Sequence, residues 1–115
     1  MKDVKRGDIW TGNLDPTVGH EIKKLRPAVI IQNNIGNKYS SMTIVAPITS
    51  QHTDKVFPIE VLLTKDNAEI EKVSKVLLNQ IRAVDKERLI KKVGRLNEET
   101  VEKVDYALKI SLGLS

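Results

Sequence analysis

The sequence predicts a mainly β protein with a C-terminal helix, an α+β fold in which the helix lies against a small, strongly bent antiparallel sheet or barrel. Two observations lead to this class. The first part of the 115-residue chain consists of short apolar segments separated by turn-forming residues, which is typical of consecutive strands. The last part changes to helical spacing, with apolar side chains at Val101, Val104 and Leu108.

Five segments are predicted as strands because each is apolar and of strand length. They are residues 8–14, 26–32, 42–48, 56–63 and 73–84. Pro58 lacks a backbone donor, so its strand is expected at a sheet edge or at a bulge. Residues 33–37, Asn-Asn-Ile-Gly-Asn, are predicted as a turn, and the charged residues 66–72 as a loop.

The C-terminal helix is predicted from both of its ends. Asn97 is placed as the N-cap, with two glutamates in the first turn, and Gly113 closes the helix. The buried face continues from Leu108 to Ser111 or Leu112. Tyr106 and Ile110 fall on the other side, where they are either isolated surface residues or part of a subunit contact.

Composition limits the classes of function. The formal net charge is +4, which favours anionic partners such as nucleic acid, although a lysine-rich surface is also common without one. The chain has no Cys, so disulfides and thiolate metal sites are excluded. The first residues lack an apolar signal core, and no apolar run has the length of a membrane span. We therefore expect one cytoplasmic domain, residues 1–115.

No metal site or cofactor is predicted. The acidic residues are scattered, no glycine-rich phosphate loop is present, and His20 and His52 are the only imidazoles. A nuclease of this composition would have to place acid–base groups and cations around the phosphate instead.

Residues 19–27 form one candidate site. His20, Glu21, Lys23, Lys24 and Arg26 lie in a loop that leads directly into a strand. Arg26, at the start of that strand, could bind phosphate oxygens with its planar guanidinium, or it could form a salt bridge with Glu21. His20 could transfer a proton near neutral pH, or it could be an ordinary surface residue.

Two further polar groups are candidate RNA contacts. Thr49 and Ser50 end a strand next to the loop that contains His52, so their hydroxyls could bind a phosphate or a ribose, or simply form a turn. Asn79 and Gln80 interrupt an apolar segment, where they must either find partners or face a cleft.

Five ordered blocks of the chain resemble MazF/PemK toxins. They are residues 6–10 (RGDIW), 14–21 (LDPTVGHE), 26–31 (RPAVII), 44–49 (IVAPIT) and 80–85 (QIRAVD). Residues 104–112 are similar too. The resemblance therefore spans about residues 6–112, and five blocks in the same order are far more specific than any one of them.

The resemblance implies an SH3-like barrel, a homodimer and a cognate antitoxin. It also implies an mRNA interferase, a sequence-specific, metal-independent endoribonuclease. Such an enzyme cleaves single-stranded mRNA at short sequence motifs by attack of the ribose 2′-OH, giving 2′,3′-cyclic phosphate and 5′-hydroxyl ends. By analogy Arg26 is the principal catalytic residue and Thr49 lies beside the scissile phosphate. His20 and Glu21 follow as catalytic residues, and Gln80 as an RNA contact.

One departure from the family matters. The PemK branch uses an Arg and an Asp in the strand before the Gln-x-Arg block, and the matching positions here are Leu77 and Asn79. Two rival functions stay open at this stage. The chain could act like the gyrase-poisoning toxin CcdB, whose fold is similar, or it could be a non-catalytic SH3-like module that binds RNA or peptide.

Overall fold

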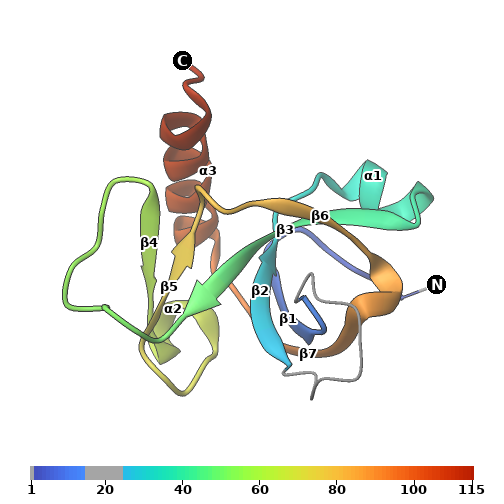
Figure 1. The fold of residues 1–115 in the computed structure, drawn as a ribbon, viewed down its shortest axis with the longest axis horizontal. Helices are drawn as coiled ribbons and strands as arrows, with labels where there is room; N and C mark the ends of the chain where they lie inside the picture. The colour runs from blue at the N-terminus through green and yellow to red at the C-terminus, as the bar shows by residue number, and fades with distance from the viewer. Residues whose placement is uncertain (1, 15–24) are drawn as a thin grey trace.

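The computed structural model describes residues 2–14 and 25–115, in which seven strands form one bent antiparallel sheet with helix α3 beside it (Figure 1). The strands are β1 (Asp8–Gly12), β2 (Arg26–Ile30), β3 (Met42–Thr49), β4 (Glu60–Leu63), β5 (Ser74–Leu77), β6 (Arg82–Asp85) and β7 (Leu89–Arg95). The helices are α1 (Asn34–Tyr39), α2 (Lys65–Ala68), the 3-10 turn η1 (Lys86–Arg88) and α3 (Glu98–Leu112). The predicted fold class is confirmed.

The strand order is β4-β5-β3-β2-β1-β7, with β6 paired to β3. Within the described ranges the end strands β4 and β7 do not pair, so the sheet bends like a barrel without closing. The predicted strand 56–63 begins only at Glu60, because the preceding residues form a turn in which the Glu60 N–H donates to the Phe57 carbonyl (2.8 Å). Pro58 lies in this turn, and β4 is an edge strand.

The predicted single strand 73–84 is two strands, β5 and β6, and both pair with β3. Ile48 of β3 pairs with Val76, and Val45 pairs with Arg82. Between these two pairs, two residues of β3 face five residues of the partner segment, and the additional residues leave the ladder between β5 and β6. The prediction of one continuous strand was wrong. Apolar residues lie on both sides of the interruption, so the sequence looks continuous, and the break is visible only in the pairing register with β3.

Strand β7 was not predicted from the sequence. Its pairing with β1 is irregular at Val93 and at Ile90, where β7 has one residue more than β1. Each bulge shifts the alternation of side chains, so the strand lacks the period of two by which strands are recognised. Gly94, in the same strand, is buried where an added Cβ would lie 2.7 Å from the Ala68 carbonyl oxygen.

Two short helices replace a predicted turn and part of a predicted loop. Asn33 caps α1 by accepting a hydrogen bond from the Gly36 N–H (2.8 Å). Thr64 begins α2, where its side chain and that of Asn67 form a reciprocal capping box. In both segments the polar side chains that suggested a loop serve as helix caps.

Helix α3 begins and ends as predicted. The Asn97 side chain accepts from the Thr100 N–H (2.9 Å), and Gly113 has the left-handed φ of 70°. Val104 is buried, whereas Tyr106 is 68% exposed. Of Ser111 and Leu112, it is Ser111 that continues the buried face of the helix. Its hydroxyl donates to the Leu78 carbonyl (3.0 Å).

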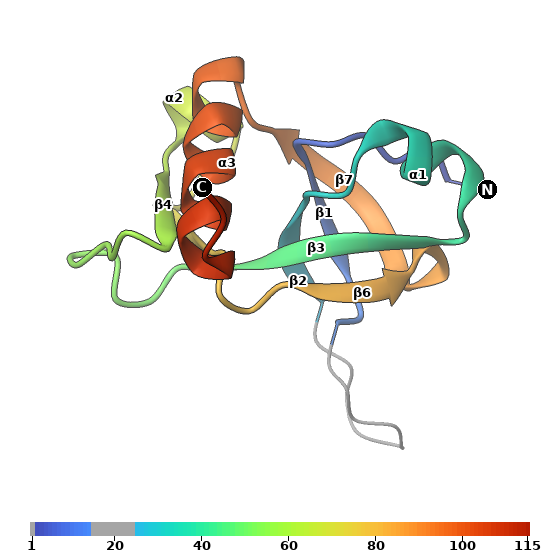
Figure 2. The ribbon, with the colours of Figure 1, turned by 90° about the horizontal axis from the view of Figure 1, so that it is seen from above.

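Two hydrophobic clusters lie on opposite faces of the sheet. One joins β4 and β5 to α3 and includes Leu63, Val76 and Val104. The other fills the curve of the sheet around Trp10 and Leu89. Figure 2 shows α3 next to β4, away from the barrel-like half of the molecule. In the described part of the chain no helix is long and apolar enough to span a membrane.

Candidate active site

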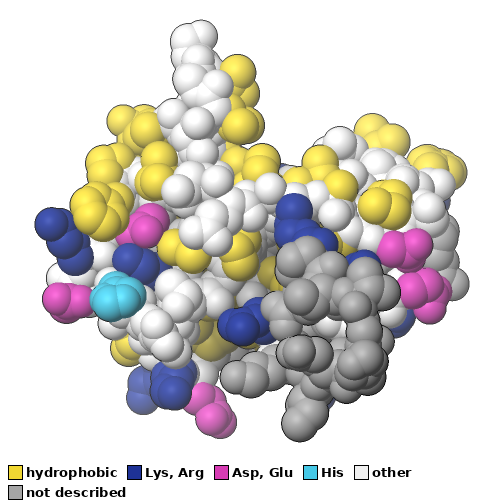
Figure 3. Space-filling model, viewed as in Figure 1, with side chains coloured by type: hydrophobic (Ala, Val, Ile, Leu, Met, Phe, Trp, Pro, Cys, Tyr) yellow, Lys and Arg dark blue, Asp and Glu magenta, His cyan; other side chains and the backbone are white. Residues whose placement is uncertain are grey.

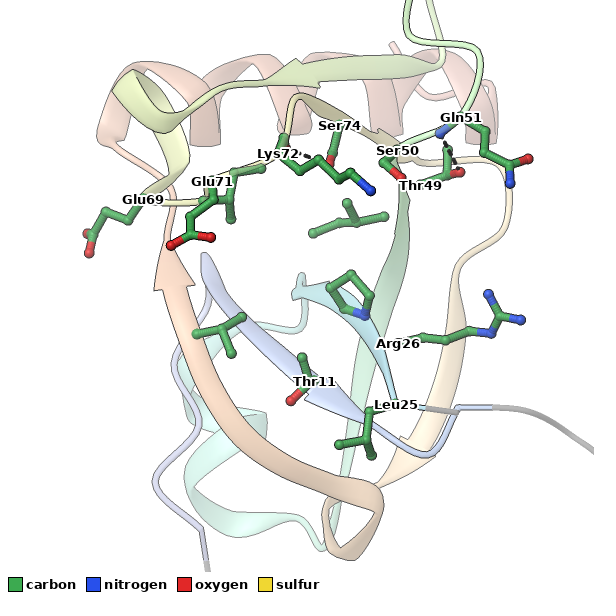
Figure 4. Close-up of a pocket in the computed structure, with 14 residues that line it drawn as sticks. Thr11, Leu25, Arg26, Thr49, Ser50, Gln51, Glu69, Glu71, Lys72 and Ser74 are labelled. Carbon is green, nitrogen blue, oxygen red and sulfur yellow. Dashed lines mark hydrogen bonds between the residues drawn. The ribbon is translucent and has the colours of Figure 1, made fainter. Parts of the chain in front are cut away.

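The register of β2 and β3 brings Arg26 and Thr49 together. Ala28 pairs with Pro47 in an antiparallel ladder, and the same register continued by two residues puts Arg26 opposite Thr49. The two residues lie at the adjacent ends of two neighbouring strands, and both line a cavity of about 660 Å³ (Figure 4). Arg26 is exposed, and Thr49 is half-buried.

Thr49 ends its strand with a specific hydrogen bond. Its Oγ1 accepts from the Gln51 N–H (3.1 Å), which turns the chain into the loop that follows β3. The hydroxyl hydrogen is not used in this bond, so it can donate to a phosphate oxygen. Arg26 leaves the start of β2 toward the side on which Gln51 lies (Figure 4). Both residues therefore lie at the edge of the cavity, and the Arg26 guanidinium points away from its interior (Figure 4).

A buried ion pair holds β5 next to Thr49. Lys75 pairs with Thr49 across the ladder, and its Nζ donates to Glu60 Oε1 (2.9 Å) and to the Lys55 carbonyl (3.0 Å). The Lys75 and Glu60 side chains are 6% and 10% exposed. The Lys55 contact also attaches the loop after Thr49 to β5.

The environment of Glu60 lowers the pKa of its carboxyl below the ordinary value of 4.5. Burial alone would raise this pKa, but the hydrogen bond from the Phe57 N–H (3.0 Å) and the charge and hydrogen bond of Lys75 outweigh it. The ionised form is therefore the one that the fold stabilises.

Of the other predicted site residues that the structure describes, one lines the cavity and the rest lie outside it. Ser50 lines the cavity with Arg26 and Thr49. His52 is exposed with a φ of 55°, and it does not line this cavity. Asn79 and Gln80 are exposed in the segment between β5 and β6, also outside the cavity. His20, Glu21, Lys23 and Lys24 lie outside the described residues.

Several cavity residues were not found by sequence reasoning. They are Thr11, Glu71, Lys72 and Ser74, which come from β1, from the loop before β5 and from β5 itself. The charged loop 66–72 was visible in the sequence, but only the fold shows that part of it lines the same cavity as Arg26. Within residues 2–14 and 25–115, no three His, Asp or Glu side chains form a group that could hold a metal ion.

The fold, a small bent sheet with a C-terminal helix, is shared with solved protein structures. A solved endoribonuclease from mycobacterial species matches with a TM-score of 0.81 at 21% identity, covering 99% of this chain and 95% of that one. A second mycobacterial structure, an endoribonuclease in complex with its cognate antitoxin, matches with the same TM-score at 20% identity, covering 97% of each chain.

Sequence comparison identifies the family. Residues 5–112 match the family described as PemK-like, MazF-like toxin of type II toxin–antitoxin system. Endoribonuclease EndoA of Bacillus subtilis (strain 168) is 45% identical over 111 residues, which are 96% of this chain and 96% of that protein. The chain belongs to the PemK/MazF-like toxin family.

The Glu60–Lys75 pair predicts how stability depends on pH. Because the folded-state pKa of Glu60 is lowered, its contribution is complete above the ordinary pKa of 4.5 and is lost as the pH falls through the folded-state value. Glu60→Gln should lower the free energy of unfolding at pH 7 by about 1–3 kcal/mol, since it weakens the bonding of a buried ammonium. This difference should shrink as the pH falls below 4.5. Urea unfolding across the pH range measures both effects.

The matched control is Glu102→Gln, which neutralises an exposed carboxylate on α3. It should leave the unfolding free energy nearly unchanged at each pH. Equal effects of the two substitutions would show that the buried pair does not stabilise the site.

Proposed function

We propose that this protein is the toxin of a type II toxin–antitoxin system and acts as a metal-independent endoribonuclease on single-stranded mRNA. The observation that carries the proposal is the position of Arg26 and Thr49 at adjacent ends of β2 and β3, because these are the two residues to which the family resemblance assigns catalysis. The relative with 45% identity is named an endoribonuclease, which supports the same activity here.

The proposed reaction is an internal transfer within the RNA. The ribose 2′-oxygen attacks the adjacent phosphorus and loses its proton to a general base, and the new P–O2′ bond forms as the P–O5′ bond breaks. The departing 5′-oxygen takes up a proton from a general acid. The products are a 2′,3′-cyclic phosphate and a 5′-hydroxyl. The nucleophile belongs to the substrate and is already positioned, so the protein has to supply proton transfer and charge stabilisation.

Arg26 and Thr49 have distinct tasks in this reaction. The Arg26 guanidinium donates in a plane to two non-bridging oxygens and stabilises the negative charge that accumulates on them. The Thr49 hydroxyl donates to the same phosphate and fixes its orientation. His20 and Glu21 are the proposed acid–base residues, in the segment that leads to Arg26.

Basic side chains provide the attraction for RNA. Lys and Arg outnumber Asp and Glu near the middle of the face shown in Figure 3, and the formal net charge is +4. Lys23 and Lys24 would contact the RNA backbone beside Arg26. The remaining proposed contacts are Ser50 and His52 after β3, and Asn79 and Gln80 between β5 and β6.

The proposed setting is the bacterial cytoplasm, where an acidic antitoxin covers the basic cleft around Lys23, Lys24 and Arg26. A structural neighbour is described in complex with its cognate antitoxin, which supports such a partner. We also propose a homodimer. Tyr106 and Ile110 are exposed on α3, and apolar side chains gather over β4 beside this helix (Figure 3).

Substitution of Arg26 tests the proposed chemistry. Arg26→Ala should slow RNA cleavage by roughly 100-fold or more, the usual effect of losing a preorganised donor to a developing charge. Arg26→Lys should not restore full activity, because an ammonium keeps the charge but lacks the planar pair of donors. Thr49→Val should also slow cleavage, because it removes the hydroxyl and keeps the branched shape. Cleavage of a labelled single-stranded RNA measures these rates.

Circular dichroism of each variant provides the control for folding. If Arg26→Ala were folded and cleaved within a few-fold of the wild-type rate, Arg26 would not be the catalytic centre, and His20 would become the first residue to test.

The dimer is tested separately at α3. Ile110→Asp should produce monomers at micromolar concentration, because it places a charge in the proposed apolar contact. Light scattering measures the mass. Ile35→Asp is the matched control, since Ile35 is 75% exposed on α1 and should have no effect. A wild-type monomer would refute the dimer, whereas an unaffected Ile110→Asp dimer would refute only the contact at α3.

A further inference from the structure

The cavity at Arg26 and Thr49 continues away from them into a part that the proposed chemistry does not use. Its apolar lining includes Pro27, Ile48 and Val93, from β2, β3 and β7. Its polar lining includes Thr11 of β1 and the loop between α2 and β5. The whole cavity, about 660 Å³, lies in the size range of sites for small organic ligands, and an apolar floor with a few polar groups is typical of them.

The loop between α2 and β5 is held on the sheet at both ends. At its start, the carbonyls of Ala68 and Glu69 pack against Gly94, where an added Cβ would lie 2.7 Å and 3.2 Å from their oxygens. At its end, the buried Ser74 hydroxyl donates to the Lys72 carbonyl (2.8 Å). The backbone between these two contacts is therefore held in place, which positions its side chains as a selective site requires.

Polar groups of opposite character occupy the two sides of this part of the cavity. In Figure 4 the Lys72 ammonium points toward Ser50, on the side of Thr49, whereas the Glu71 carboxylate points toward the β7 side. The Thr11 hydroxyl lines the same cavity and donates to the Lys91 carbonyl (3.3 Å), so its lone pairs are left to accept. The Lys72 ammonium is thus a hydrogen-bond donor on the side of Thr49, and Glu71 and Thr11 provide hydrogen-bond acceptors on the other side.

We infer that this part of the cavity is a subsite for one unpaired nucleobase next to the cleaved bond, and that it selects bases with an exocyclic amino group over uracil. The inference rests on the proposed function. Pro27, Ile48 and Val93 contact the faces of the base, Glu71 and Thr11 accept from its amino group, and Lys72 binds a phosphate of the same nucleotide. Uracil presents the O4 carbonyl where these bases carry the amino group, which places an acceptor against the Glu71 carboxylate and adds repulsion.

Cleavage of a pool of randomised single-stranded RNA tests this selection. When the new ends are sequenced, the wild-type protein should disfavour uracil about tenfold at one position beside the cleaved bond, as expected for one charged contact to a base. Glu71→Gln should reduce this discrimination at that position alone, because its amide N–H₂ can donate to O4 of uracil. Unchanged preferences at every position in Glu71→Gln would overturn the inference.

Glu69→Gln is the matched control. Glu69 contributes to the same pocket wall and loses the same charge, but its side chain points away from the cavity (Figure 4). It should leave all base preferences as in the wild type. An equal change in both variants would indicate a general effect of charge and would also overturn the inference.

Binding of free nucleotides separates failure of the subsite from failure of the proposed activity. Adenosine and cytidine 5′-monophosphates should shift the backbone amide resonances of Thr11, Lys72 and Val93 in the wild type, and uridine 5′-monophosphate should shift them much less. If RNA is not cleaved but this pattern is seen, the subsite stands and the proposed activity fails. Equal shifts by all three nucleotides would refute the selection.

Discussion

The pairing of β3 with its neighbours is the constraint on which the candidate site depends. This strand pairs with β2 on one side and with β5 and β6 on the other. Arg26 and Thr49 face each other only in the observed register, because side chains alternate between the two faces of a sheet. A slip of one residue would carry Arg26 to the opposite face. The chemistry that we propose therefore requires a correct strand register before it requires any particular loop.

Buried polar groups secure β3 near both ends, and this explains why they occur in an otherwise apolar sheet. Near Thr49, Lys75 binds Glu60 and the Lys55 carbonyl. Near the start of the strand, Thr43 donates to the Asn37 side chain (2.7 Å), and the Lys86 ammonium binds the Asn37 carbonyl. Because a buried polar group is costly unless its partners are in place, such contacts penalise other registers more than apolar packing does.

The parts of the fold with regular patterns could be predicted from the sequence. The strands around residues 8–12, 26–30 and 42–49 and the capped helix α3 carry local signals. Strand β7 could not be predicted, because its two bulges remove the alternation, and the break between β5 and β6 is visible only in their pairing with β3. These features depend on contacts between distant residues, which local propensity does not encode.

In the candidate site, too, some residues could be recognised from the sequence and others could not. The positions of Arg26 and Thr49 at strand ends could be predicted from the sequence, and the catalytic role that the family resemblance assigns to them stays a prediction. Glu71 and Lys72 could not be recognised, since a charged loop is usually only a solvated surface, and nothing local shows that this one faces a cavity. Thr11 was hidden for a similar reason, because a threonine inside a strand is common in any sheet.

The most direct test of the account is to incubate the wild-type protein with a long single-stranded RNA in excess EDTA and to determine the chemistry of the ends. The account predicts cleavage as fast as without the chelator, with 2′,3′-cyclic phosphates and 5′-hydroxyls on the fragments, because the attacking oxygen belongs to the RNA and the charge is stabilised by Arg26. RNA that stays intact, as expected of a gyrase-poisoning toxin or a non-catalytic binding module, or fragments that carry 5′-phosphates, would contradict it.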